Sequence, residues 1–158
     1  MVAMSSDEAF LEALAAALDA VGLEALVVGM TGAALQGVPA MTEDVDLLVR
    51  DTDRNRQKLE QLCAALGGLS PVQVTELAEV LTLVGGAVPV DIVFDRLPGG
   101  LEFASLRSRS VEVPVGSRRV RVAALEDIVR SKKAADRPKD RAQMPILEQT
   151  LAVLKKLQ

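Results

Sequence analysis

Two aspartates lie one residue apart inside an apolar run of the sequence. Asp44 and Asp46 belong to the segment 42–49, Thr-Glu-Asp-Val-Asp-Leu-Leu-Val. Side chains alternate between the two faces of a β-strand, so both carboxylates point one way while Val45 and Leu47 point into the core. Carboxylates beside apolar residues are costly unless a cation pairs with them, and a divalent metal ion is the obvious candidate. The pattern therefore predicts a chelating edge.

A third aspartate lies in a similar apolar run. Asp91 occupies the segment 88–94, Val-Pro-Val-Asp-Ile-Val-Phe. If this strand lies beside the one that carries Asp44 and Asp46, the three acids converge and can hold two magnesium ions together with nucleotide phosphates. Asp95 would point to the same face as Asp91, but it follows the end of the strand, so we interpret it as a loop or capping residue.

A glycine ends an apolar strand about fifteen positions before Asp44. Residues 26–29 read Leu-Val-Val-Gly, and the small residues Thr31, Gly32, Ala33 and Ala34 follow. Backbone N–H groups at such a turn can approach a phosphate group.

The residue types that are missing exclude several kinds of chemistry. The chain has no His, which excludes Ser-His and Cys-His catalysis and His-ligated zinc within it. Cys63 is the single cysteine, so no internal disulfide forms, and we expect it to fill the core. Carboxylates, Lys, Arg and hydroxyls remain, the groups used in magnesium-dependent phosphoryl and nucleotidyl transfer.

Length and composition predict one globular domain over residues 1–158. The chain has 158 residues, of which 49% are hydrophobic, and this is enough for a sizeable core. Its longest apolar stretch, 13–38, is interrupted by charges and glycines, so we expect no membrane span. The N-terminal residues lack the pattern of a signal peptide, and we expect a cytoplasmic protein.

Periodicity and turn residues predict helices and strands mixed along the chain, as in an α/β (α+β) fold. Helices are expected at about 6–21, 31–36, 52–66, 101–107, 124–135 and 146–157. Strands are expected at about 26–29, 45–50, 72–77, 80–84, 88–94, 111–115 and 118–122.

Charge is distributed unevenly along the chain, although the net charge is only −4. Residues 1–104 contain 16 acidic and 5 basic side chains, whereas residues 105–158 contain 6 acidic and 13 basic ones. An acidic half that holds cations and a basic half that holds phosphates would suit a metal–nucleotide enzyme. Two solvated surfaces of opposite charge that favour docking of the halves are the alternative.

Together these motifs resemble the DNA polymerase β-type nucleotidyltransferase superfamily. The segment 27–47 carries the strand-end glycine and the Asp-Val-Asp pair, and it is similar to the minimal and abortive-infection-type (toxin–antitoxin) branch. The segment 125–140, Leu-Glu-Asp-Ile-Val-Arg-Ser-Lys-Lys-Ala-Ala-Asp-Arg-Pro-Lys-Asp, resembles the C-terminal part of that branch. The similarity covers about residues 23–147. It implies a nucleotidyltransferase fold, with a mixed central β-sheet flanked by helices.

The resemblance also implies roles for individual residues. Asp44 and Asp46 would ligate the metal ions, and Asp91 would complete the triad and activate the acceptor hydroxyl. Gly29 would contact the triphosphate, and Lys132 would neutralise phosphate charge. Lys132 and Lys133 lie about 100° apart around a helix, so only one of them is expected to face the site; a solvated helix face is the alternative for Lys132.

Three positions depart from the family pattern. Met30 follows the strand-end glycine where Gly or Ser is usual, which places a bulky side chain where phosphate would approach, and Thr31 or Gly32 would have to compensate. Gln36 and Ala40 stand where related sequences often carry His and Arg.

These observations lead to a principal hypothesis and two rivals. The first is a magnesium-dependent transfer of NMP from an NTP to a hydroxyl of a protein, a tRNA or a small molecule, in a toxin–antitoxin or defence setting. The second, motivated by Met30 and Ala40, is a catalytically weakened nucleotide-binding or protein-interaction module. The third is an antitoxin-like chain that docks onto another chain through the helix at 146–157. A partner protein or a homodimer is also expected as a possible assembly.

The basic hairpin at 118–122 is a separate candidate surface. Arg119 and Arg121 share one face of a strand, which fits contact with an RNA backbone, but a charged sheet edge that discourages aggregation fits better. Three Phe and no Tyr or Trp leave almost no stacking platform for bases.

Overall fold

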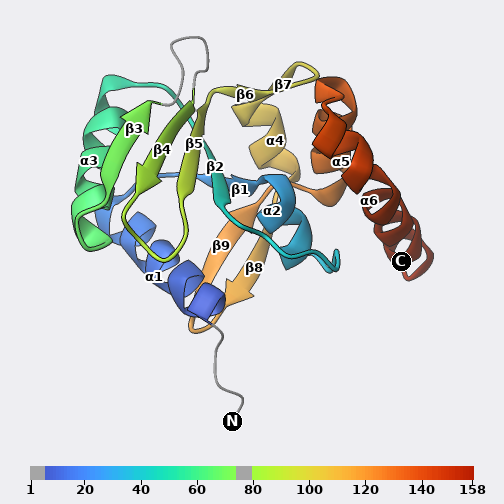
Figure 1. The fold of residues 1–158 in the computed structure, drawn as a ribbon, viewed down its shortest axis with the longest axis horizontal. Coiled ribbons are helices and arrows are strands. Elements are labelled where there is room, and N and C mark those ends of the chain that lie inside the picture. Colours follow the sequence, from blue (N-terminus) through green and yellow to red (C-terminus); the bar gives the residue numbers. More distant parts are fainter. Residues whose placement is uncertain (1–5, 74–79) are drawn as a thin grey trace.

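A mixed sheet of seven strands forms the centre of the protein within residues 6–73 and 80–158, the part that the computed structural model describes (Figure 1). Its strands are β1 (Leu26–Val28), β2 (Val45–Val49), β3 (Ser70–Gln73), β4 (Val80–Val84), β5 (Val90–Phe94), β8 (Val111–Val115) and β9 (Arg118–Val122). They lie in the order β3-β4-β5-β2-β1-β9-β8. The pairs β2–β5 and β1–β9 are parallel, and the other neighbours are antiparallel. A second, two-stranded sheet pairs β6 (Arg96–Leu97) with β7 (Leu101–Glu102).

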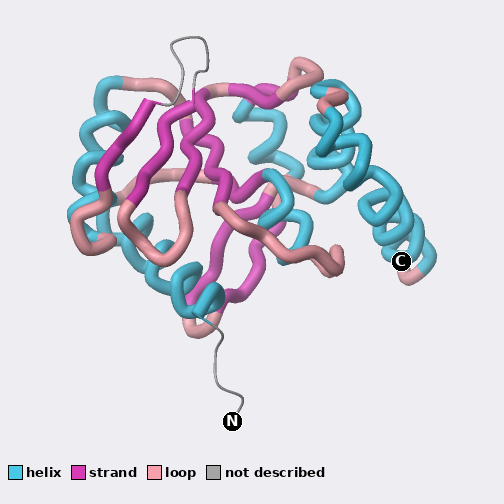
Figure 2. Tube along the Cα trace, in the orientation of Figure 1, coloured by secondary structure: helices cyan, strands magenta, loops and turns pink. Residues whose placement is uncertain are grey.

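Helices cover both faces of the central sheet (Figures 1 and 2). They are α1 (Ser6–Val21), α2 (Gly29–Leu35), α3 (Asp53–Ala65), α4 (Phe103–Arg109), α5 (Leu125–Ala135) and α6 (Pro138–Lys156). Buried residues of α1 and α3 form one hydrophobic cluster with the sheet, and buried residues of α2, α4, α5 and α6 form the other. The expected α/β fold with a mixed, helix-flanked sheet is therefore confirmed.

Strand β2 shows how the sequence pattern places the acids. Val45, Leu47 and Val49 are at most 3% exposed and belong to the cluster beneath α1 and α3. Leu48 is buried in the cluster on the opposite face. Asp46 points to that same opposite face, because side chains two residues apart share a face.

Several element boundaries differ from the sequence expectations. The last helix begins at Pro138 rather than Ile146, because Pro138 occupies the first turn, where no backbone N–H is needed, and the helix then continues through Pro145. Helix α4 begins at Phe103, since Leu101 and Glu102 pair with β6 instead. The strand expected at 72–77 is β3, at 70–73, and positions 74–77 lie outside the described residues.

In the described ranges, no helix combines the length and the apolar character that crossing a membrane requires.

Candidate active site

The three predicted carboxylates come together where β2 lies beside β5. Asp46 and Asp91 are direct register partners across this parallel pair, and Asp44 precedes Asp46 by two residues on the same side. One carboxylate oxygen from each of the three lies within 4.8 Å of the others. Three hard oxygen donors at this spacing are the ligands that magnesium prefers.

Burial and the mutual repulsion of the carboxylates raise the pKa values of Asp44 and Asp46. Burial raises the pKa of Asp46 to about 7, and the nearby charges of Asp44 and Asp91 add to the effect. Burial also raises the pKa of Asp44, as does its contact with Asp91, while Lys139 acts in the opposite direction. A bound cation would remove the repulsion, so the donor set fits a divalent metal ion.

Gly29 leaves the space that the Asp46 carboxylate occupies. Its backbone has φ +65°, and a Cβ at this position would overlap Asp46 Oδ2. Only glycine satisfies both the left-handed backbone and the close approach. The strand-end glycine therefore lies directly against the acidic cluster.

A buried lysine faces the carboxylates from α5. Lys132 is 8% exposed and donates from Nζ to Asp140 Oδ1 at 3.3 Å. Asp140 is fully buried and also accepts from Arg137, at 2.7 Å from Nε and 3.2 Å from Nη2. Burial acts to raise the pKa of Asp140, but the hydrogen bonds from Arg137 outweigh it and the pKa is lowered. The Asp140 carboxylate thus holds the side chains of Lys132 and Arg137 in place.

These groups line one cleft of about 260 Å³. Gly29 and the three aspartates form one side, and Ser131, Lys132, Arg137 and Lys139 contribute the other polar side chains. Lys133 is exposed and pairs with Glu148 at 3.0 Å, so of the two adjacent lysines it is Lys132 that faces the cleft. The acidic and basic halves of the sequence meet here.

Replacing Asp140 with Asn should leave the buried Lys132 charge without its anionic partner. We expect a loss of about 3–5 kcal/mol in the free energy of unfolding, the cost of breaking a buried ion pair. Urea denaturation measures it. Asp136→Asn is the matched control, because Asp136 forms an exposed ion pair with Arg141 at 2.8 Å and such pairs contribute about 0–1 kcal/mol. Equal losses for the two variants would contradict the anchoring role of Asp140.

The other predicted contact residues lie around the cleft rather than in it. Thr31 donates from Oγ1 to the backbone oxygen of Asp44 at 2.6 Å, so its hydroxyl fixes the chain leading into the carboxylate pair. Met30 and Ala40 are partly buried and pack against the hydrophobic cluster shared by α2, α5 and α6. Neither belongs to the cleft lining.

Sequence reasoning missed several residues that build the site. Arg137 and Lys139 line the cleft. From the segment 125–140, the sequence resemblance implied a role in the site only for Lys132. Gln36 clamps α2 to the start of α5: its Nε2 donates to Ala123 O at 2.8 Å, and its Oε1 accepts from Leu125 N at 3.1 Å. Gln36 is a polar residue between two apolar segments of the sequence, and this position could have indicated a structural hydrogen bond.

Solved structures show the same arrangement of elements. ANT(2'')-Ia, solved with adenylyl-2''-tobramycin, superimposes with a TM-score of 0.69 at 19% identity, covering 96% of this chain and 92% of that one. The chain has the nucleotidyltransferase fold. The lincosamide antibiotic adenylyltransferase LnuA, bound to lincomycin, gives 0.64 at 13% identity over 93% and 98% of the two chains. TM1012 of Thermotoga maritima, provisionally assigned as a nucleotidyltransferase, gives 0.61 at 20% identity over 98% and 95%.

Comparison of sequences, unlike comparison of structures, finds no match. No protein-family model matches this chain, and no curated protein matches it.

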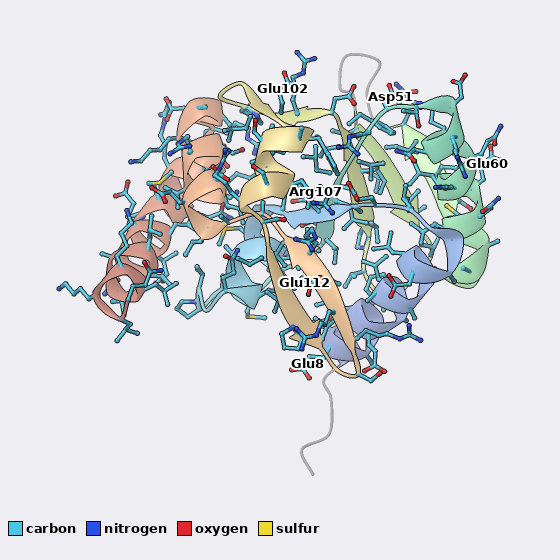
Figure 3. The ribbon with its side chains drawn as sticks, turned by 180° about the vertical axis from the view of Figure 1, so that it is seen from behind. Glu8, Asp51, Glu60, Glu102, Arg107 and Glu112 are labelled. Atoms are coloured by element: carbon cyan, nitrogen blue, oxygen red, sulfur yellow. The ribbon has the colours of Figure 1, made fainter. Side chains whose placement is uncertain are left out.

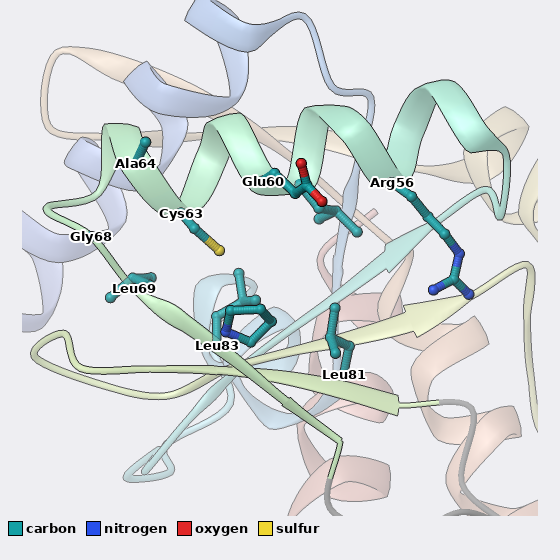
Figure 4. A pocket seen from close by; sticks show the side chains of 10 residues that line it. Arg56, Glu60, Cys63, Ala64, Gly68, Leu69, Leu81 and Leu83 are labelled. Carbon is teal, nitrogen blue, oxygen red and sulfur yellow. The ribbon is translucent and has the colours of Figure 1, made fainter.

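A larger cavity of this nucleotidyltransferase fold lies away from the carboxylates. It measures about 520 Å³ and is lined mainly by aliphatic side chains of α3, β3 and β4 (Figure 4). Leu81 and Leu83 line this cavity, so it lies on the side of β4 opposite to Thr82. Cys63 lines its wall, and burial raises the pKa of that thiol, which fits the expected filling role better than a reactive one.

The basic hairpin pairs with acids of the same chain. Glu112 of β8, labelled in the rear view of Figure 3, lies 3.1 Å from Arg121 and 4.0 Å from Arg119. Arg118 lies 3.7 Å from Asp19. The arginines belong to β9, the neighbour of the edge strand β8. The expectation that these arginines form a charged sheet edge is therefore wrong, because β8 is the edge strand, and their ion pairs within the chain argue against RNA contact.

Proposed function

We propose that this protein is a magnesium-dependent nucleotidyltransferase that moves NMP from an NTP to an acceptor hydroxyl. The observation that carries the proposal is the cleft in which Asp44, Asp46 and Asp91 converge opposite Lys132, Arg137 and Lys139. One side can hold metal ions, and the other can bind phosphates.

Each side of the cleft has a distinct part in the reaction. Asp44, Asp46 and Asp91 would hold two magnesium ions, which when bound supply positive charge beside the phosphates. Lys132, Arg137 and Lys139 bind and orient the triphosphate, and their charges stabilise the pyrophosphate as it leaves. Gly29 lets the backbone come close to the substrate.

Asp91 is placed to receive the proton of the acceptor. The acceptor oxygen forms a bond to the α-phosphorus, the bond from that phosphorus to the pyrophosphate oxygen breaks, and the hydroxyl proton passes to Asp91. Asp91 lies between Asp46 on β2 and Thr82 on β4 and lines the cleft. A carboxylate that lines the cleft can act as general base towards the acceptor hydroxyl.

A small hydroxylated molecule is the acceptor class that we favour. ANT(2'')-Ia and LnuA act on antibiotics and resemble this chain over more than nine-tenths of both lengths in each pair. The sequence similarity to the toxin–antitoxin branch motivates a protein or tRNA acceptor as the second class. Val153 and Leu157 of the C-terminal segment are 51% and 78% exposed, and co-purification tests whether that end docks onto another chain.

The catalytically weakened alternative rested on Met30 and Ala40. Both side chains pack against the hydrophobic cluster and leave the cleft lining to other residues. The position of Met30 outside the cleft lining supports the catalytic proposal over the weakened module.

Transfer from radiolabelled NTP to a panel of acceptors tests the proposal. We expect label on an acceptor only when magnesium is present, because the acidic cluster must be neutralised before an anionic nucleotide binds. Calorimetry with NTP and magnesium accompanies the assay. Binding without transfer to any acceptor of the panel would favour the weakened module, and no binding would reject both.

A further inference from the structure

Strand β4 presents different side chains to the two faces of the sheet. Leu83 is fully buried in the cluster beneath α1 and α3, and Leu81 packs against the same cluster. Thr82 lies between them and points to the opposite face. Val80, two residues before Thr82, shares its face of the strand and lines the carboxylate cleft. A strand that supplies none of the three aspartates thus reaches the site.

Thr82 makes one specific contact there. It is the register partner of Asp91 across the antiparallel pair β4–β5, and its Oγ1 donates to Asp91 Oδ1 at 2.6 Å. The threonine side chain is stiff because it is branched at Cβ. A short hydrogen bond to a carboxylate oxygen from a stiff side chain on a neighbouring strand fixes the orientation of that carboxylate.

We infer that Thr82 is a positioning residue for the acidic cluster. Its hydroxyl donates to Oδ1 of Asp91, and the same carboxylate contributes an oxygen to the cluster with Asp44 and Asp46. Without the hydroxyl, the Asp91 carboxylate gains rotational freedom and loses one of its hydrogen bonds, so the divalent site is less well formed. The inference rests on the proposed metal-dependent function and adds to it a residue outside the recognised sequence motifs.

Binding of Mn²⁺ without nucleotide, followed by electron paramagnetic resonance, provides a test that does not depend on activity. Thr82→Val removes the hydroxyl at nearly constant shape, and we expect Mn²⁺ affinity to fall by about 10–100-fold, as when other partners of metal ligands are removed. Thr82→Ser keeps the donor and should restore affinity to within about threefold of the wild type. Thr150→Val is the matched control, because it removes a hydroxyl that donates to Ile146 O within α6.

The possible results separate this inference from the function on which it rests. Wild-type affinity in a folded Thr82→Val protein would overturn the role of Thr82 and leave the metal site intact. No saturable Mn²⁺ binding by the wild type would overturn the metal site itself. Thr82→Ala, which places no methyl group against the carboxylate, replaces the valine variant if circular dichroism shows that the latter does not fold.

Discussion

Asp46→Asn is expected to abolish nucleotide transfer and, at the same time, to stabilise the metal-free protein at neutral pH. The first effect follows from the loss of a metal ligand, and we expect a decrease in kcat/KM of about 10³-fold or more. The second follows from the electrostatics of the cluster, because burial and two neighbouring carboxylates raise the pKa of Asp46 from 3.8 to about 7.

The sign of the pH dependence follows from that shift. Between pH 3.8 and about 7 the folded protein binds more protons at Asp46 than the unfolded chain does, so wild-type stability should decrease as pH rises through this window. At pH 8 Asp46 is ionised in the folded protein, and the resulting loss in the free energy of unfolding is on the order of 2–4 kcal/mol. Asn carries no charge, so the variant should lack this decrease.

Thermal melts of the metal-free proteins from pH 5 to pH 8 measure the effect. Asp53→Asn is a suitable control, because it removes an exposed carboxylate in the first turn of α3 and should change neither activity nor the pH profile. A variant Asp46→Asn that melts below the wild type at pH 8, or that transfers nucleotide normally, would contradict this account of the cluster.

Gly29→Ala should reduce activity far more than stability. The backbone at Gly29 has φ +65°, and an added Cβ would displace the Asp46 carboxylate. Because the carboxylate is the far end of a side chain, it can rotate away at modest cost, but it then leaves the metal site. We expect kcat/KM to fall by about 10²-fold or more, with a loss of about 1–2 kcal/mol in stability from the left-handed backbone.

Gly100→Ala separates the two contributions. Gly100 has φ +71° and nothing within 4 Å of the position of a Cβ, so it has the same backbone cost without the collision. Chemical denaturation and kinetics of both variants, side by side, provide the comparison. If Gly100→Ala reduced activity as much as Gly29→Ala, proximity to Asp46 would not be the reason for glycine at position 29.

The convergence of the three acidic side chains could be predicted from the sequence for a physical reason. Asp44, Asp46 and Asp91 are charges inside strongly apolar strands, and alternation on a strand fixes their relative direction. Their pairing across β2 and β5 was an assumption from the sequence, and the structure supplies it through the register of Asp46 with Asp91.

The basic side was harder to predict, because exposed cations are common and carry no periodic signal. Only Lys132 was singled out, and its burial depends on Asp140, eight residues later. Arg137 and Lys139 flank Pro138, where α6 begins, and both line the cleft. Gln36 contacts a segment 89 residues away, and Thr82 contacts Asp91 only through the register of β4 with β5, neither of which a local pattern reveals.

The most direct test of the central claim is the position of a bound metal ion. Crystals grown with Mn²⁺ and a non-hydrolysable NTP analogue would locate it by anomalous scattering. We predict a peak within about 2–2.5 Å of oxygens of Asp44, Asp46 and Asp91, with the triphosphate extending towards Lys132. A triphosphate bound elsewhere, or a cluster without an anomalous peak at saturating Mn²⁺, would contradict the proposed nucleotidyl-transfer site.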